Sequence, residues 1–393
     1  MKIGIAVWDL NISGGTQRQA LELARNLRLR GHEVLLYCVY YNDRICYPEL
    51  ISDFRVKYLI STDDEKHTIK SSSTDRNYSV PLSFFKKVRG LVGLFDRDLD
   101  ILNIHDYLTY FVAPSFSRKY HRPIVWMMND MPVDEPRFPD AKNSRLGSLT
   151  LMFKRSFLKI FISKIDEIVV LDNWNKNKLK KAYGREAKVI RSGLDIDSYK
   201  FKSRDRNKCM RIFMAGIFFP WRRFEDVILA LNVLKQKNIP FELHHVGSDK
   251  RDRDYASKIY GLVDNLGLEE KVTFHGFVSE NDLRELYSTS DAFVFPNYPQ
   301  TWGLAVFEAM ACGTPVICST GAGAHEVLTD KKNVLFVPPM IPERIADCLL
   351  DLYSDDELWH KLHINGRTFV EKNITWEKYT SNIEHVFKTL TRG

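Results

Sequence analysis

Short apolar runs alternate with longer amphipathic segments along the whole chain. Residues 2–8 form an apolar run that predicts a buried strand, and the helical pattern that follows its glycine-containing turn ends at Gly31. The second half repeats this order, with expected strands at residues 210–215, 241–246, 272–274, 291–295, 316–318 and 334–336. Alternating strands and helices predict an α/β fold with parallel sheets covered on both faces.

The length predicts two domains of this kind. A chain of 393 residues is long for one domain and sufficient for two. Near residues 199–207 the sequence becomes charged and loses its periodicity, which indicates a domain boundary. We therefore expect one domain over residues 1–200 and a second over residues 201–375.

Composition narrows the class of partner. The net charge of +7 fits an anionic substrate or an anionic membrane surface, and no Lys/Arg block with interleaved aromatic residues indicates a nucleic-acid site. Six singly spaced cysteines predict reduced core residues, not a disulfide framework or a zinc site. The opening MKIGIAVWDL does not resemble a signal peptide, and no apolar run could span a bilayer, so we expect a cytoplasmic protein.

Two segments predict basic amphipathic helices. Residues 82–95 carry an apolar stripe with Lys86, Lys87 and Arg89 off it. Residues 145–164 contain no Asp or Glu. This second helix has two interpretations: a helix lying on an anionic membrane, or a helix packed on the core with a solvated basic face.

The most informative stretch is residues 295–326. An apolar run stops at Pro296, a polar turn and a tight Gly303 follow, and then a helical pattern begins. Trp302, Gly303 and Leu304 would present free backbone N–H groups there, at the positive end of the helix dipole. Such a site suits a ligand with hydroxyls and a phosphate, although an ordinary Gly-rich βαβ turn has the same pattern.

This stretch resembles the signature of the retaining glycosyltransferases of family 4, which have the GT-B fold. That signature is a Glu, seven residues, a second Glu and an Ala-Met-Ala-Cys-Gly-x-Pro-Val-Ile tail. Here the tail is residues 309–317, the second acid is Glu308, and Gln300 replaces the first. The resemblance implies two Rossmann-like domains facing across a central cleft. It also implies that the last helix, within residues 376–393, returns to the first, acceptor-binding domain, and that the second domain binds a nucleotide-diphosphate sugar.

The loop after residues 210–215 is the expected diphosphate site. Relatives show Gly-Arg-x-x-x-x-Lys-Gly, so from Gly216 onward Ile217 stands at the arginine position and Arg222 at the lysine position. Arg223 stands at the final glycine. Two arginines at a helix N-terminus predict an anion site, the alternative being a chance surface pair.

The resemblance assigns further donor contacts. It implies that Glu308 accepts from ribose hydroxyls and that Phe277 and Val278 form the wall for the base. The Gly14-Gly15 loop resembles the family's loop that approaches the donor phosphate and sugar, the alternative being a tight turn that needs positive φ. No metal-ligand set is visible, so arginines and helix N-termini would meet the leaving-group charge.

The expected catalytic group is His105, Gln300 and Arg222. His105 ends a presumed parallel strand, where the family places a histidine against the donor sugar. Asp130, after the strand at residues 123–128, is the expected acceptor-binding residue or else part of a surface turn. Gln300 cannot readily form the ester of a double displacement, which predicts retention without a covalent intermediate or, alternatively, a weak or inactive enzyme.

The leading hypothesis is a retaining, metal-independent glycosyltransferase. It would use a nucleotide-diphosphate sugar, no separate cofactor, and a glycan, lipid-linked or small-molecule acceptor, in the cytoplasm and in contact with the inner face of the membrane. The alternatives are a non-catalytic nucleotide-sugar-binding protein or partner subunit, suggested by Gln300 and Ile217, and a GT-B relative with other chemistry such as epimerisation.

Overall fold

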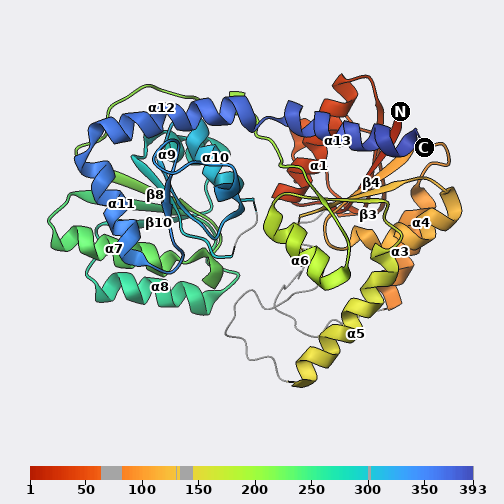
Figure 1. Cartoon of the computed structure of the whole chain (residues 1–393), viewed down its shortest axis with the longest axis horizontal. Helices are drawn as coiled ribbons and strands as arrows, with labels where there is room; N and C mark the ends of the chain where they lie inside the picture. Colours follow the sequence, from red (N-terminus) through yellow and green to blue (C-terminus); the bar gives the residue numbers. More distant parts are fainter. Residues whose placement is uncertain (63–81, 130, 133–144, 300–301, 393) are drawn as a thin grey trace. The chain divides into compact units, whose positions relative to one another are not determined.

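The computed structural model describes residues 1–62, 82–129, 131–132, 145–299 and 302–392 (Figure 1). The chain forms two compact units. One contains Met1–Ser192 together with Trp376–Gly393, and the other contains Gly193–Thr375. Each unit is a parallel sheet with helices on both faces, which confirms the α/β fold class with two Rossmann-like domains.

The first unit has, in its described residues, a seven-stranded sheet in the order β3-β2-β1-β4-β5-β6-β7. The strands are β1 (Lys2–Leu10), β2 (Glu33–Tyr41), β3 (Val56–Ser61), β4 (Ile101–His105), β5 (Ile124–Met128), β6 (Glu167–Val170) and β7 (Lys188–Val189). Its helices are α1 (Gly15–Leu29), α2 (Pro48–Ile51), α3 (Leu82–Leu94), η2 (Thr109–Val112), α4 (Ala113–Tyr120), α5 (Arg145–Ile162), α6 (Asn173–Tyr183) and α13 (Trp376–Thr391). The interior strand residues are buried because helices cover the sheet on both faces.

The second unit has a six-stranded sheet in its described residues, in the order β10-β9-β8-β11-β12-β13. The strands are β8 (Met210–Ala215), β9 (Phe241–Val246), β10 (Val272–Gly276), β11 (Ala292–Phe295), β12 (Val316–Ser319) and β13 (Leu335–Val337). The helical segments are η3 (Ile196–Ser198), η4 (Pro220–Arg222), α7 (Phe224–Gln236), α8 (Arg253–Asn265), α9 (Glu280–Thr289), α10 (Leu304–Ala311), η5 (Gly323–Glu326), α11 (Pro342–Ser354) and α12 (Asp356–Asn373). All the strands predicted for this half are present, within two residues of their expected ends.

The last helix, α13, buries an apolar face in the first unit and also carries one paired carboxylate. On α13, Glu384 accepts from Arg30 Nη1 at 3.1 Å and lies 2.9 Å from His32 Nε2. Hydrogen bonds from Lys388, His32 and Arg30 lower the pKa of Glu384 to about 2, so this carboxylate is charged at neutral pH. An ion-pair network therefore joins the two ends of the chain.

The first unit ends earlier than the expected boundary after residue 200. Leu194 N donates to Ile374 O at 3.0 Å, and Tyr199 O accepts from Arg367 Nη1 at 2.7 Å. Both partners belong to the second unit, so these hydrogen bonds place residues 193–200 with it.

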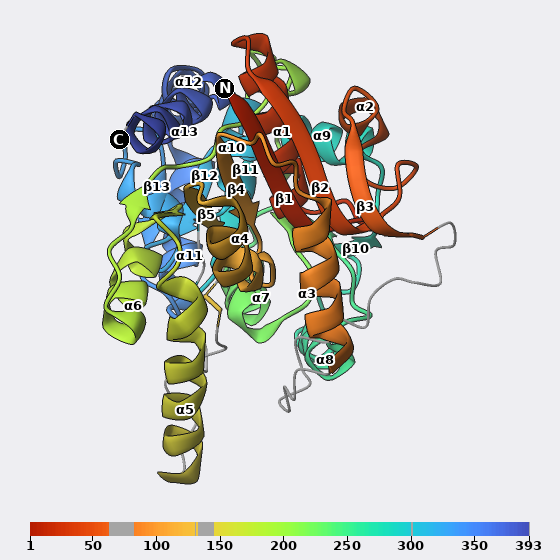
Figure 2. The ribbon, with the colours of Figure 1, turned by 90° about the vertical axis from the view of Figure 1, so that its right-hand side faces the viewer.

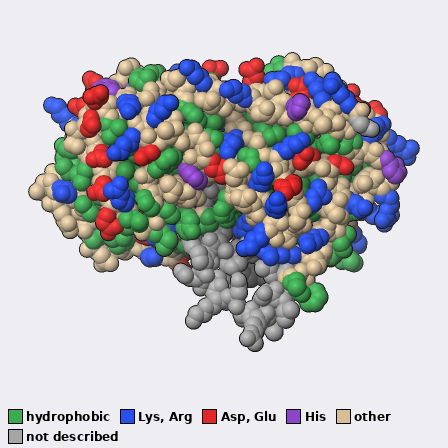
Figure 3. All heavy atoms as spheres, viewed as in Figure 1, with side chains coloured by type: hydrophobic (Ala, Val, Ile, Leu, Met, Phe, Trp, Pro, Cys, Tyr) green, Lys and Arg blue, Asp and Glu red, His purple; other side chains and the backbone are tan. Residues whose placement is uncertain are grey.

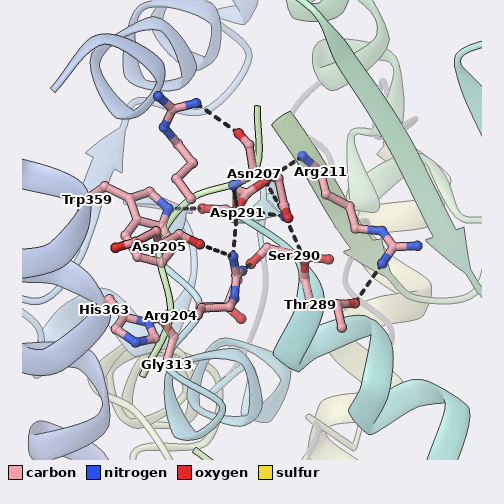
Figure 4. Close-up of polar contacts among 12 residues, drawn as sticks. Arg204, Asp205, Asn207, Arg211, Thr289, Ser290, Asp291, Gly313, Trp359 and His363 are labelled. Atoms are coloured by element: carbon pink, nitrogen blue, oxygen red, sulfur yellow. Dashed lines mark hydrogen bonds and ion pairs between the residues drawn. The ribbon is translucent and has the colours of Figure 1, made fainter. Parts of the chain in front are cut away.

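A buried carboxylate ties the entry segment of the second unit to its sheet (Figure 4). Asp291 has no exposed surface, and its carboxylate accepts from Arg204 Nη1 at 2.9 Å and from Arg211 N at 2.8 Å. Asn207 N also donates to this carboxylate, at 3.0 Å, while Trp359 Nε1 donates to the Asp291 carbonyl at 2.9 Å. Because Arg211 lies in β8 and Asp291 directly precedes β11, the cluster holds these two neighbouring strands together.

Candidate functional site

In each sheet the strand order reverses between two adjacent strands. The pair is β1 and β4 in the first sheet and β8 and β11 in the second. Connections leave such a pair toward opposite sides, and in open α/β sheets ligands bind beyond the carboxyl ends of these strands. Gly14 and His105 lie at the first of these points, and Gly216 and Gly303 lie at the second. These four predicted residues therefore each lie at the switch point of their own sheet.

The loop after β8 brings Gly216 and Arg222 together. Gly216 has φ of 150°, and a Cβ atom built on it would lie 3.2 Å from Arg222 Nε. A Cβ atom at Gly247 would overlap the Gly216 carbonyl, so two backbones approach closely here. The Arg222 side chain thus lies against a bare backbone, at the position expected for the donor diphosphate.

Behind this loop is a buried histidine that the sequence interpretation did not assign to the site. His245 has no exposed surface, and its ring centroid lies 4.7 Å from that of Phe218 and 4.6 Å from that of Phe224. Burial lowers the pKa of His245 to about 3, so the ring is neutral. It supports the Gly216 loop as a packed aromatic group. A polar residue in the apolar run of β9 was the only sequence signal for it.

Arg223 is held by carboxylates. Its Nε and Nη2 donate to Asp226 at 2.9 and 2.7 Å, and its Nη1 lies 3.1 Å from Glu225. Its φ of 55° is in the left-handed region, at the position where relatives have glycine. The guanidinium thus neutralises two acids at the start of α7, which counts against Arg223 as a phosphate ligand.

The loop after β11 is joined to the loop after β8. Tyr298 N donates to Trp221 O at 2.8 Å. Trp302 is buried against Phe307 with a centroid distance of 4.5 Å, and Gly303 precedes α10 with φ of 78°. The α10 N-terminus, with Leu304 as its first residue, therefore lies at the carboxyl edge of the sheet as predicted. Gln300 lies outside the described residues.

Glu308 on α10 is positioned by a buried tyrosine. Tyr287 Oη donates to Glu308 Oε2 at 3.0 Å. Burial, together with the neighbouring Glu308 carboxylate, raises the pKa of Tyr287 well above its ordinary range, so the phenol keeps its proton and acts as the donor. The half-buried Glu308 is oriented as a hydrogen-bond acceptor.

The predicted base wall lies on the same edge of the second sheet, after β10. Phe277 is 89% exposed and Val278 is half-buried. Gly247 N donates to Gly276 O at 2.9 Å, which links this loop to the end of β9. β9 separates β10 from β8, so Phe277 is set apart from Arg222 by the width of one strand.

In the first unit, neither Gly14 nor Gly15 has a backbone conformation that favours glycine over other residues. Gly14 is extended, with φ of −136° and ψ of 166°, and Gly15 is the first residue of α1. The tight-turn explanation by positive φ is therefore wrong. A Cβ atom on Gly15 would meet nothing within 4 Å, so the missing side chain leaves open space at the start of α1.

His105 is buried at the end of β4. Its Nε2 lies 2.8 Å from Asn103 Oδ1, and burial lowers the pKa of His105 to about 3. The next residue, Asp106, accepts from Trp8 N at 2.6 Å and from Thr109 Oγ1 at 2.7 Å, which ties β4 to β1. The imidazole at this point of the sheet is thus neutral, buried and in contact with Asn103.

Two further polar residues share this edge and were not predicted as site residues. Ala6 pairs with Ile104 and His105 pairs with Met127, and this register places Asp9, His105 and Asn129 on one face of the sheet. Asn129 Nδ2 donates to Thr16 Oγ1 at 3.1 Å. Burial and the nearby Asp106 raise the pKa of Asp9 to about 7.

A polar residue at the end of an apolar strand was the available sequence signal for Asp9 and Asn129. The predicted acceptor-binding residue Asp130 follows Asn129 and lies outside the described residues.

Within the described ranges, no three His, Cys, Asp or Glu side chains are grouped to hold a metal ion. No helix in the described part of the chain has the length and apolar character needed to cross a membrane.

Known families match both units. The Glycosyltransferase Family 4 model matches residues 13–198, and the Glycosyl transferases group 1 model matches residues 195–369. The chain therefore belongs to the group 1, family 4 glycosyltransferases, and it is an enzyme of the glycosyltransferase class.

Individual relatives align with this chain over almost its full length. An uncharacterized glycosyltransferase of Methanocaldococcus jannaschii is 24% identical, covering 99% of this chain and 98% of its own. A phosphatidyl-myo-inositol mannosyltransferase of Mycobacterium leprae is 25% identical, covering 99% and 97%. The structure of Anabaena HepE in complex with UDP superposes with a TM-score of 0.77 at 18% identity, covering 99% of this chain and 100% of HepE. This likeness shows that the two domains have the GT-B fold.

Proposed function

We propose that this protein is a retaining, metal-independent glycosyltransferase that uses a nucleotide-diphosphate sugar. The observation that carries the proposal is the group at the β8–β11 switch point. There Arg222 lies against the bare backbone of Gly216, and Glu308 is held as an acceptor by Tyr287. A guanidinium and a helix N-terminus suit a diphosphate, and a fixed carboxylate suits ribose hydroxyls.

For the nucleotide we propose uridine. HepE has been solved with UDP and with UDP-glucose, and it shares the fold of this chain. In this proposal the base lies against Phe277 and Val278, and the diphosphate lies between Arg222 and the N–H groups of Trp302, Gly303 and Leu304. The acceptor is a glycan, a lipid-linked sugar or a small molecule bound by the first unit.

The proposed reaction exchanges one C–O bond for another on the same face of the sugar. The bond from the anomeric carbon to the β-phosphate oxygen breaks while the acceptor oxygen bonds to that carbon, and the acceptor proton passes to the leaving phosphate. Arg222 and the α10 dipole offset the charge that develops on the diphosphate. The neutral His105 offers a hydrogen bond to a sugar hydroxyl, and Gln300 holds the sugar without forming an ester.

Donor turnover tests this proposal. UDP-, GDP- and ADP-sugars are incubated with the enzyme, with and without acceptor sugars and in EDTA, and the product's anomeric configuration is read by NMR. We expect a UDP-sugar to be consumed with retention, at a rate that EDTA does not change. Tight binding without turnover would replace the proposal with a non-catalytic binding protein, and isomerised donor would replace it with an epimerase. A glycosyl–enzyme adduct in mass spectrometry would overturn the mechanism.

We also propose that the enzyme works in the cytoplasm, beside the inner face of the membrane. The basic charge and the acid-free segment at residues 145–164 support this location.

A further inference from the structure

Helix α5 exposes large apolar side chains along one face. Phe153 is 70% exposed, Phe157 43% and Ile160 58%, and their spacing of four and three residues places them on one side of the helix. Met152, 55% exposed, lies beside them. The outward side of the described part of α5 is thus mainly apolar, so its solvated face is not simply the basic one that the core-helix interpretation expected.

The opposite side of α5 is anchored in the core of its unit. Leu158 and Ile162 are buried, and the Phe161 ring lies 4.7 Å from the Phe111 ring. Arg185 donates to the Ile162 carbonyl at 3.0 Å, which satisfies one acceptor at the end of the helix. The exposed side chains therefore stand on a preformed helix.

Helix α3 adds a second set of such residues. Leu82 is 78% exposed and Phe85 37% exposed, and Lys86 and Arg89 lie on the same side of the helix. The Phe85 ring is 6.3 Å from Phe111, the ring that also contacts α5. In Figures 1 and 2 both helices extend toward the same end of their unit, and α5 projects well beyond its sheet.

Charge of a single sign accompanies these apolar groups. Neither α3 nor α5 contains Asp or Glu, and Lys159 and Lys164 are exposed beside the apolar face of α5. Figure 3 shows apolar side chains at the lower edge of this unit, with Lys and Arg above them. Exposed apolar groups flanked only by cations match a bilayer interface that carries anionic headgroups.

We propose that this unit docks on an anionic lipid bilayer through what we call the α3–α5 surface. It consists of Leu82, Phe85, Lys86, Arg89, Met152, Phe153, Phe157, Lys159, Ile160 and Lys164. The apolar side chains enter the boundary between headgroups and acyl chains, while the lysines and arginine bind headgroup phosphates. The contact places the acceptor-binding unit at the membrane, where a lipid-linked acceptor would be found. It does not depend on the transferase proposal.

Vesicle co-sedimentation tests the proposal. The wild-type protein is mixed with phosphatidylcholine vesicles, with and without phosphatidylglycerol, at low and high salt. We expect binding that requires phosphatidylglycerol and weakens with salt. Phe153→Ser/Ile160→Ser and Lys159→Glu/Lys164→Glu are each expected to weaken binding at least about tenfold.

Matched controls change equally exposed residues elsewhere. Leu29→Ser/Ile364→Ser replaces side chains that are 78% and 45% exposed, and Lys331→Glu/Lys332→Glu reverses two exposed charges in the second unit. We expect both to bind vesicles like the wild type. All variants are expected to keep the wild-type melting temperature and its shift by UDP, which separates failure of docking from failure of folding or donor binding.

Four results would overturn the proposal. The first is no binding of the wild type to phosphatidylglycerol vesicles at low salt, and the second is unchanged binding of both α5 variants. The third is a dimer in lipid-free sedimentation that Phe153→Ser/Ile160→Ser dissociates, because this surface would then belong to a second copy of the chain. In a Phe157→Trp variant, quenching by brominated lipid should exceed that of the wild type, and no added quenching would also count against docking.

Discussion

Arg223 donates through Nε and Nη2 to both carboxylate oxygens of Asp226, three residues along the chain. This fork-shaped pair occupies the guanidinium that the sequence suggested as a replacement phosphate ligand. Glu225 adds a second carboxylate 3.1 Å from Nη1. Two neighbouring arginines thus have different surroundings: Arg223 pairs with acids at the start of α7, and Arg222 lies against Gly216, where we propose the donor diphosphate.

The first prediction separates these two arginines. Arg222→Ala should weaken UDP binding by about tenfold or more, because a charge-assisted hydrogen bond contributes about 1.5–3 kcal/mol. Arg223→Ala should leave UDP affinity within about threefold of the wild type and lower the free energy of unfolding by about 1–3 kcal/mol, because the buried Asp226 carboxylate loses its donor. Calorimetric titration and urea unfolding measure the two effects. If Arg223→Ala loses UDP affinity as Arg222→Ala does, the assignment is wrong.

The second prediction concerns the tyrosine behind Glu308. Tyr287→Phe removes the hydrogen bond that orients the carboxylate, so donor affinity should fall by about threefold to tenfold, equivalent to about 1 kcal/mol. The matched control is Tyr120→Phe, which removes a 2.8 Å bond to the Val92 carbonyl in the first unit. That control should keep wild-type affinity for UDP. Equal losses in the two variants would mean that Tyr287 acts only through stability.

The third prediction is a dependence of stability on pH set by Asp9. The pKa of Asp9 is about 7 in the folded protein, against an ordinary value of 3.8. Between these values the folded state holds a proton that the unfolded state has released. The free energy of unfolding therefore falls as pH rises through this window, by about 1.4 kcal/mol per pH unit, and levels off above it.

Asp9→Asn should remove that slope and stabilise the protein at pH 8. Urea unfolding at about pH 5, 6, 7 and 8 measures how the free energy of unfolding depends on pH. Asp98→Asn is the control. A hydrogen bond from Lys2 lowers the pKa of Asp98, so this carboxyl group changes the pH dependence of unfolding only under more acidic conditions. A wild-type slope that persists in Asp9→Asn would show that another group titrates.

The fourth prediction concerns the buried Asp291 cluster. Asp291→Ala removes the buried carboxylate that pairs with Arg204 and accepts from two backbone N–H groups, so the free energy of unfolding should fall by about 3–5 kcal/mol. The control is Asp351→Ala, at an exposed position on α11. This substitution should change the free energy of unfolding by less than about 0.5 kcal/mol. A change at Asp291 as small as at the control would mean that water replaces the carboxylate.

The amino-acid sequence alone determined the class of fold and the family. Apolar runs of strand length alternate with helical patterns, and this local order is enough to predict parallel α/β units because each strand must be buried on both faces. The signature tail at residues 309–317 and the glycine after β8 predicted which strand ends carry the chemistry. Such signals are local, since they depend on neighbours along the chain.

Only the tertiary structure decided which partner each polar group has. Arg222 and Arg223 are adjacent and chemically identical, yet their surroundings differ because Arg223 adopts a left-handed conformation and reaches Asp226, whereas Arg222 lies against Gly216. The raised pKa of Asp9 depends on its burial and on Asp106, which the neighbouring strand β4 brings close. The outward apolar face of α5 could not be told from a core face, because helical periodicity gives the spacing of apolar residues and not what covers them.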